Sequence, residues 1–140
     1  MVRTSLLVGA VLTTVLSIAL TIVTTGAHAA AIRDAGLFNS NTLAANDDGS
    51  TAEVNIGFAV NINGTLYSQL YVNNNGNVSF TSPVSTFTPS GIIDGNFPII
   101  APFWADVDTR GAGSGLTRYG AVAANGTTAA MFGVNWIDVG

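Results

Sequence analysis

From Val54 to Ile62 the chain carries a large apolar side chain at every second position, and this pattern constrains the fold more than any other feature. Such a period of two is typical of a β-strand with one buried face and one exposed face. The Asn63-Gly64 pair that follows favours a type I′ turn, because both turn positions need a positive φ angle. We therefore predict a β-hairpin that begins with this strand.

The second strand of the predicted hairpin covers residues 65–72. Its alternation is expected to place Leu66, Leu70 and Val72 on one face, with Tyr67 and Tyr71 on the other. An asparagine-rich turn then leads into a third strand at residues 77–81. Three consecutive antiparallel strands in a meander follow from this order.

The rest of the chain adds further short strands. Residues 82–96 are rich in Pro, Gly, Ser and Thr and predict a long connection, whereas the apolar residues 97–108 contain two prolines and predict an edge or bulged strand. A short strand is expected at residues 116–122, and a candidate core strand at residues 131–137 lies within the last segment, residues 127–139; the turn-forming pair Asn125-Gly126 lies between them. With no helical periodicity after residue 30, the fold class is all-β, an antiparallel β-sandwich-like module.

The N-terminal region predicts export. Arg3 precedes an uncharged apolar stretch from Leu6 to Val23, and Ala27-His28-Ala29 has the form of a signal peptidase site. We therefore interpret residues 1–29 as a helical signal peptide, with the mature chain starting at Ala30 and residues 30–52 as a polar lead-in on the surface. The alternative is an uncleaved membrane anchor, because the apolar stretch is close to the length of a membrane span.

The composition restricts the possible partners. The chain contains no cysteine, so neither disulfides nor a lipid-modified cysteine can hold it. After residue 29 three arginines stand against eight acidic residues, a formal charge of −5. Such a surface repels phosphate backbones and anionic membranes, which argues against nucleic acid binding and against membrane contact beyond the signal sequence.

Catalytic chemistry is limited in the same way. The only histidine is His28, inside the predicted signal, and the chain has no lysine, so the usual nucleophile–base pairs and imidazole metal sites are missing after residue 29. A carboxylate pair, Asp106 and Asp108, is the tightest acidic candidate. Their spacing places both on the face of a strand that also carries Trp104, but a glycosidase needs its two carboxyls across a deep sugar cleft. We therefore predict that the chain is not an enzyme and needs no cofactor other than a possible metal ion.

The possible metal is calcium, which prefers hard oxygen ligands such as those of Asp106 and Asp108. The competing interpretation, which we favour, is that these aspartates end the strand, accept backbone hydrogen bonds and pair with Arg110 or Arg118. Asp47 and Asp48 are the next candidates for a cation site.

Two further groups of residues have alternative interpretations. The asparagines of the predicted turn could form a polar ligand-binding ridge, but asparagine tolerates left-handed backbone and is common in turns without any ligand, which we favour. These residues are Asn73, Asn74, Asn75 and Asn77. Trp104 and Trp136 have apolar neighbours and are expected in the core rather than on a contact surface.

Three stretches, in this order and spacing, resemble the nidogen-type extracellular (NIDO) domain family. They are Leu70-Tyr71-Val72-Asn73-Asn74-Asn75-Gly76-Asn77-Val78-Ser79-Phe80, then Ile99-Ile100-Ala101-Pro102-Phe103-Trp104-Ala105-Asp106-Val107-Asp108-Thr109-Arg110, and Val134-Asn135-Trp136. The resemblance covers the chain from about residue 50 onward and implies a NIDO-like β domain at residues 53–140. Because family members continue with further strands after the third stretch, it also implies a domain that is incomplete at its C-terminal end.

The resemblance implies a secreted or surface-exposed, non-catalytic binding module of cell–matrix or cell-surface adhesion. Its partner would be an extracellular matrix protein, a cell-surface protein or a glycan. A passive structural spacer in an envelope or matrix protein is the alternative, and a glycoside-acting enzyme that uses carboxylates alone comes third. The family offers no settled binding motif, so no site residues can be transferred from it.

Overall fold

The computed structural model describes residues 34, 36–89 and 97–140. The chain divides into two compact units, residues 1–30 and residues 31–140. The predicted signal helix falls in the first unit, outside the described residues. Within the described part of the chain the secondary structure consists of strands and turns, and no helix there is long and apolar enough to span a membrane.

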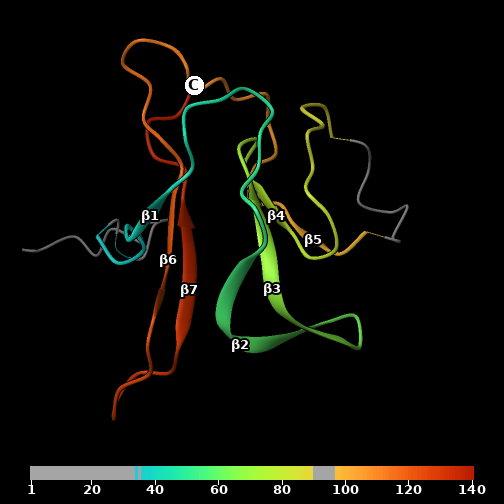
Figure 1. The fold of residues 1–140 in the computed structure, drawn as a ribbon, viewed down its shortest axis with the longest axis vertical. Helices are drawn as coiled ribbons and strands as arrows, with labels where there is room; N and C mark the ends of the chain where they lie inside the picture. Colours follow the sequence, from blue (N-terminus) through green and yellow to red (C-terminus); the bar gives the residue numbers. More distant parts are fainter. Residues whose placement is uncertain (1–33, 35, 90–96) are drawn as a thin grey trace, which may run out of the picture. The chain divides into compact units, whose positions relative to one another are not determined.

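A four-stranded antiparallel sheet contains the predicted meander (Figure 1). Its order is β2-β3-β4-β5, with β2 at Val54–Ile62, β3 at Thr65–Asn73, β4 at Asn77–Ser79 and β5 at Ile99–Ile100. Asn63 and Gly64 join β2 to β3 with φ angles of 51° and 89°. The positive φ at both positions confirms the predicted hairpin turn.

The face assignment predicted for β3 is wrong at its first half. Leu66 is 67% exposed, whereas Tyr67 packs on Phe80 with their ring centroids 5.2 Å apart. The reason is a bulge or irregularity in the β2–β3 pairing, where the register shifts between Asn55 and Val60 and the burial pattern of β3 stops alternating between Tyr67 and Leu70. Gly57 lies inside this bulge with a φ of 84°. A bulge changes which residues of two strands face each other, so simple alternation fails across it.

The apolar run at residues 97–108 forms much less strand than predicted. Within this run the structure has one strand, β5, which is two residues long and pairs with β4 at the edge of the sheet. The residues after Ile100 are irregular up to the turn that precedes β6. The two prolines in this run have no backbone N–H to donate to a sheet. Further along, the Val107 backbone is bonded by the Asn74 and Asn75 side chains of the β3–β4 turn.

The second sheet is three-stranded, in the order β1-β6-β7. Here β1 is Asn41–Thr42, β6 is Arg118–Val122 and β7 is Met131–Asn135. The antiparallel pairing of β6 with β7 confirms the predicted hairpin. By contrast, the predicted polar lead-in is not simply irregular, because it contributes β1 at the edge of this sheet.

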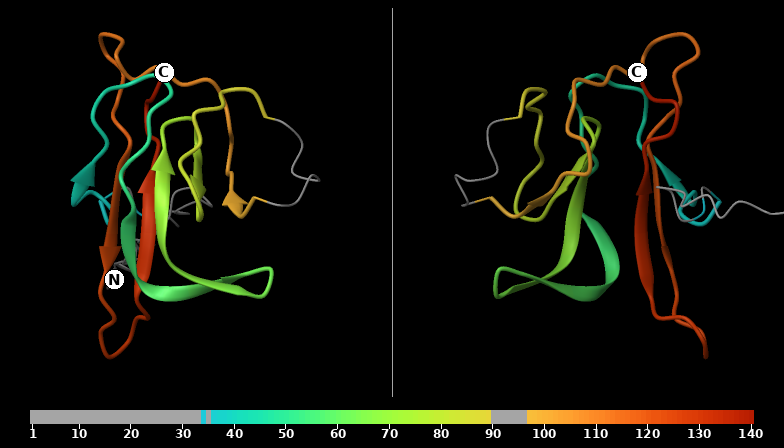
Figure 2. Two further views of the ribbon diagram at one scale, coloured as in Figure 1. Left: turned by 45° about the vertical axis from the view of Figure 1, so that its right-hand side comes forward. Right: turned by 180° about the vertical axis from the view of Figure 1, so that it is seen from behind.

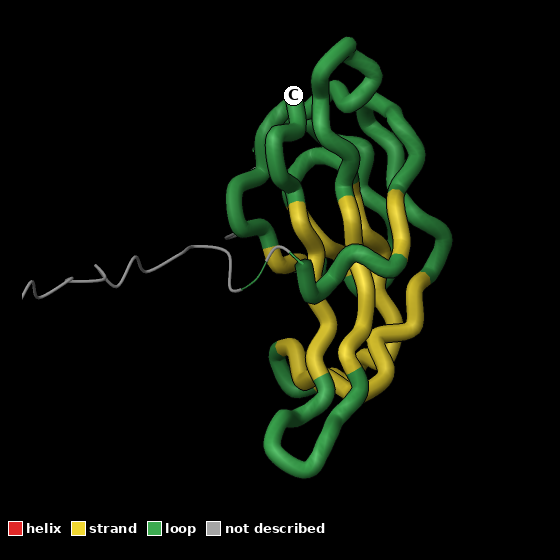
Figure 3. Tube along the Cα trace, turned by 90° about the vertical axis from the view of Figure 1, so that its left-hand side faces the viewer, coloured by secondary structure: helices red, strands yellow, loops and turns green. Residues whose placement is uncertain are grey.

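The two sheets form a β-sandwich, seen as two layers in Figures 1 and 2 and face-on in Figure 3. The buried core comes mainly from the four-stranded sheet and consists of Ile56, Leu70, Val72, Val78 and Phe80. Half-buried apolar side chains from β6 and β7 pack against it from the other layer. The prediction of an antiparallel all-β sandwich is therefore confirmed for the described residues.

Candidate functional site

The turn between β3 and β4 is buried rather than exposed. Asn73, Asn74, Asn75 and Asn77 are each at most 1% exposed. None of them has a positive φ, and the left-handed position of the turn is taken by Gly76, with a φ of 77°. These asparagines therefore belong to a turn and form no exposed ridge, as we favoured. Side-chain hydrogen bonds, and not left-handed backbone, account for their positions.

The Asn74 and Asn75 side chains bind two loops that lie far from them in the sequence. The Asn74 Nδ2 group donates to the carbonyl oxygens of Asp47 at 2.6 Å and Val107 at 2.5 Å. The Asn75 Oδ1 atom accepts from the backbone N–H of Val107 at 2.9 Å, and its Nδ2 group donates to Asp48 Oδ1 at 2.8 Å. Buried amides that satisfy otherwise unpaired backbone groups fix the position of those groups.

A direct link also joins the two loops. The Thr109 hydroxyl donates to the carbonyl oxygen of Asn46 at 2.8 Å, and the backbone N–H of Thr109 donates to the same oxygen at 2.9 Å. In return, the Asn46 N–H donates to the Thr109 hydroxyl oxygen at 2.9 Å. The loop after β1 and the loop after β5 are therefore held side by side at one end of the sandwich.

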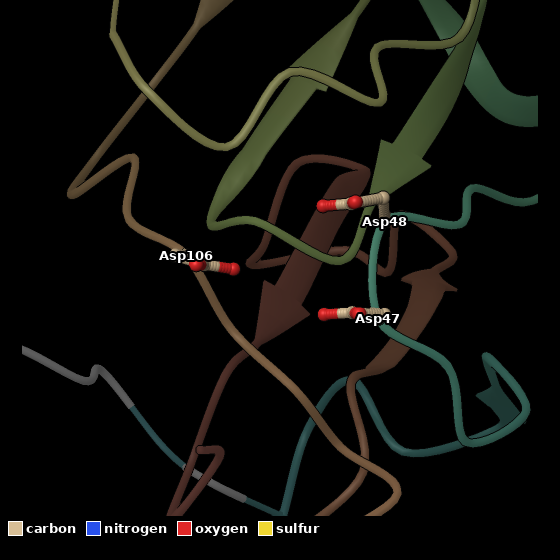
Figure 4. A group of neighbouring side chains, drawn as sticks. All are labelled: Asp47, Asp48 and Asp106. Atoms are coloured by element: carbon tan, nitrogen blue, oxygen red, sulfur yellow. The ribbon is translucent and has the colours of Figure 1, made fainter.

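This arrangement brings three carboxylates together. One oxygen each of Asp47, Asp48 and Asp106 lies within 4.8 Å of the others. Figure 4 shows Asp47 and Asp48 on one loop directed toward Asp106 on the other. Asp47 and Asp48 are partly buried, while Asp106 is exposed.

Asp108 has a different environment. Its carboxylate accepts hydrogen bonds from Arg110 Nε at 2.7 Å, from Nη2 at 2.7 Å and from the Arg110 backbone N–H at 3.0 Å. The hydrogen bonds from the Arg110 side chain and backbone lower the pKa of Asp108 to about 2. The same guanidinium also pairs with Asp47 at 2.8 Å, and the hydrogen bonds that it donates to the Asp108 carboxylate raise the pKa of Arg110.

The predicted pair Asp106 and Asp108 does not lie on a strand, because the chain is irregular from residue 101 to residue 108. Asp108 pairs with Arg110, as in the interpretation that we favoured, and Asp106 faces Asp47 and Asp48. No local sequence signal connects Asp47 with Asp106. The asparagine-rich turn that joins their loops was visible in the sequence, but its long-range partners were not.

Chemically, the cluster of Asp47, Asp48 and Asp106 offers hard oxygen atoms at a short mutual distance. Carboxylate oxygens of this kind are what calcium prefers, although calcium takes six to eight oxygen ligands and the cluster supplies only part of such a set. Arg110 neutralises part of the charge of Asp47. The arrangement can attract a divalent cation.

The two tryptophans have different roles. Trp136 is half-buried, packs against the core and donates its indole N–H to the Asn73 carbonyl at 3.1 Å. Trp104 is outside the core cluster and donates its indole N–H to the Thr86 carbonyl at 2.8 Å. The expectation of a core position is confirmed for Trp136 and is wrong for Trp104, whose backbone has a positive φ of 22° in an irregular segment.

Fold and site together define an all-β module whose one end is organised by buried amides and carries clustered carboxylates. A family model described as "NIDO related" matches residues 24–139. The chain belongs to this NIDO-related family.

The chain is also similar to alpha-tectorin from three vertebrates. It is 51% identical to the Mus musculus protein, 49% identical to the Homo sapiens protein and 43% identical to the Gallus gallus protein, in each case over 63 residues. These alignments cover 44% of this chain and only 3% of each relative. No solved structure matches the chain.

Proposed function

We propose that this chain is a secreted, non-catalytic binding module that acts in adhesion at the cell surface or in the extracellular matrix. The observation that carries the proposal is the family match over residues 24–139, together with the similarity to alpha-tectorin. The predicted signal sequence is consistent with export. The partner is a matrix protein, a surface protein or a glycan.

The chemistry of the described residues supports a binding role over a catalytic one. The cavity between the sheets is lined by apolar residues only, so it offers no carboxylate pair to a sugar. The clustered carboxylates lie instead on two exposed or half-buried loops at the end of the sandwich. Loops presented by a rigid β scaffold are frequent binding surfaces.

We further propose that a cation bound at Asp106 contributes to this adhesion. Asp106 and Asp108 were the predicted ligands, and the geometry favours Asp47 and Asp48 as partners of Asp106. Asp108 is engaged by Arg110, which makes it the weaker candidate. Calcium in such a site would stiffen the two loops and offer an open coordination position to a partner.

A cell-adhesion assay tests the proposal. Surfaces are coated with the exported chain, and cells or matrix proteins are added in calcium or in chelator. We expect attachment that is lost when Asp47, Asp48 and Asp106 are all changed to Asn, whereas Glu53→Gln, at an exposed acid outside the cluster, leaves it unchanged. A folded chain that retains no cell and no matrix component would favour the passive spacer instead.

A further inference from the structure

A cavity of about 230 Å³ lies between the two sheets. One wall is the inner face of the four-stranded sheet, including Phe58 and Phe80, and the other wall comes from Phe132 and Trp136 in and after β7. Ile100, on the edge strand β5, also lines the cavity and is 48% exposed, which places it at the rim. The cavity is separate from the acidic cluster, because no carboxylate lines it.

The lining defines what the cavity can hold. Its twelve residues are all apolar or glycine. The one side-chain polar group among them, the Trp136 indole N–H, already donates to the Asn73 carbonyl. A charged or strongly polar ligand would therefore lose its hydration without gaining a hydrogen bond. Four aromatic side chains in the lining favour an aromatic ligand through offset and edge-to-face contacts.

The size sets an upper limit on the ligand. An engineered apolar cavity of about 150 Å³ in another protein takes up benzene, while sites for drug-sized ligands begin at about 300 Å³. This cavity lies between these volumes. Phe58, Phe132 and Val134 face it and are only partly buried, so a ligand would remove exposed apolar surface from water.

We propose that the inter-sheet cavity binds a small, uncharged aromatic molecule of one or two rings. This inference does not depend on the adhesion proposal, since it concerns different residues and a different class of ligand. A second copy of the chain that inserts a side chain into the cavity is the competing occupant.

Titration of the exported chain with toluene, followed by NMR, tests the proposal. The sequence has two tryptophans, and only Trp136 lines the cavity, so the Trp104 indole N–H signal is an internal control. We expect toluene to shift the Trp136 signal saturably, with one molecule per chain, and to leave the Trp104 signal in place. Benzoate, which has a similar size but carries a charge, should cause no shift at the same concentration.

Matched variants distinguish binding in the cavity from nonspecific hydrophobic binding elsewhere on the surface. Ile100→Asp puts a carboxylate at the rim and should weaken toluene binding by about tenfold or more. Leu66→Asp makes the same change at an exposed apolar residue outside the cavity and should leave binding unchanged. Val60→Phe fills the cavity without a charge and should abolish the shift, which keeps the test valid if Ile100→Asp unfolds.

Three results would overturn the proposal. These are shifts of both indole signals without saturation, equal toluene affinity in all variants, or a Trp136 signal that moves with protein concentration before any ligand is added. The last result, together with a larger species in size-exclusion chromatography, would show that a second copy covers the cavity.

Discussion

Gly76 and Phe103 link the two most distinctive sequence motifs of the chain. Gly76 has a φ of 77°, and a Cβ atom at this position would lie 2.5 Å from carbons of the Phe103 ring. Phe103 in turn packs edge-on against Trp136, with ring centroids 5.8 Å apart. The asparagine-rich turn and the Ala-Pro-Phe-Trp run therefore pack together, because the Phe103 ring occupies the space that the missing side chain of Gly76 leaves open.

Gly76→Ala should destabilise the fold more than Gly64→Ala does. Both positions have positive φ, which costs a non-glycine residue about 1–2 kcal/mol. At Gly64 nothing lies within 4 Å of the added carbon, whereas at Gly76 the contact with Phe103 adds about 1–3 kcal/mol of overpacking. Urea unfolding of both variants measures the difference. Equal losses of unfolding free energy in the two variants would mean that the Phe103 ring moves aside at no cost. Adding Phe103→Leu should restore stability to Gly76→Ala and not to Gly64→Ala.

Asp108 should make stability depend on pH in the acid range. Arg110 lowers the pKa of Asp108 from 3.8 to about 2 in the folded chain, so the folded state favours the ionised carboxylate. The stabilisation is therefore present above pH 4 and is lost as the pH falls through about 2. Asp108→Asn should lower the thermal midpoint at pH 7, and only modestly, because exposed ion pairs contribute little to stability. The effect should shrink progressively below pH 4, as Asp108 of the parent chain becomes protonated. A midpoint difference that is independent of pH would contradict this account.

At the scale of elements, the segment just before β1 lies against the two glycines of the β6–β7 hairpin. Gly120 and Gly133 face each other across β6 and β7. A Cβ atom at Gly120 would contact Ser40, and one at Gly133 would contact the Phe38 ring. The two glycines thus leave room for a segment that lies far away in the sequence.

Gly133→Ala should detach this segment or destabilise the sheet by about 1–3 kcal/mol, the usual cost of overpacking. The added methyl group meets the Phe38 ring, so Phe38→Ala should recover much of the loss. Gly126→Ala is a suitable control, since nothing lies within 4 Å of a Cβ atom there. Thermal unfolding gives the stability, and limited proteolysis at residues 36–43 reports on detachment. If Phe38→Ala does not restore stability to Gly133→Ala, the loss does not come from the contact with the Phe38 ring.

At the scale of the whole molecule, one end of the sandwich differs from the rest. Buried amides, carboxylates and Arg110 concentrate where the loops after β1 and β5 meet the β3–β4 turn. The interior between the sheets is apolar. A cation held by Asp47, Asp48 and Asp106 would therefore link two loops that lie far apart in the sequence and stabilise the folded state.

Calcium should raise the thermal midpoint of the chain if the proposed cation site exists. An ion that binds only the folded state stabilises it by about 2.7 kcal/mol at a hundred times its dissociation constant. We expect Asp106→Asn to remove most of this gain, Asp47→Asn with Asp48→Asn to do the same, and Asp108→Asn to remove less because Arg110 engages that carboxylate. An unchanged midpoint in calcium and in chelator would end the cation hypothesis. A gain retained in every variant would place the ion elsewhere.

The sequence by itself determined the all-β class, the meander and the Asn63-Gly64 turn, because these depend on side-chain period and on the φ preferences of neighbouring residues. Only the tertiary structure decided the outward position of Leu66, the irregular course of residues 101–108 and the grouping of Asp106 with Asp47 and Asp48. Each of these depends on contacts beyond the local sequence: an irregular register between β2 and β3, backbone groups bonded by Asn74 and Asn75, and two loops joined through Thr109. Local patterns carry no information about such contacts, since the partners are chosen by the packing of the whole chain.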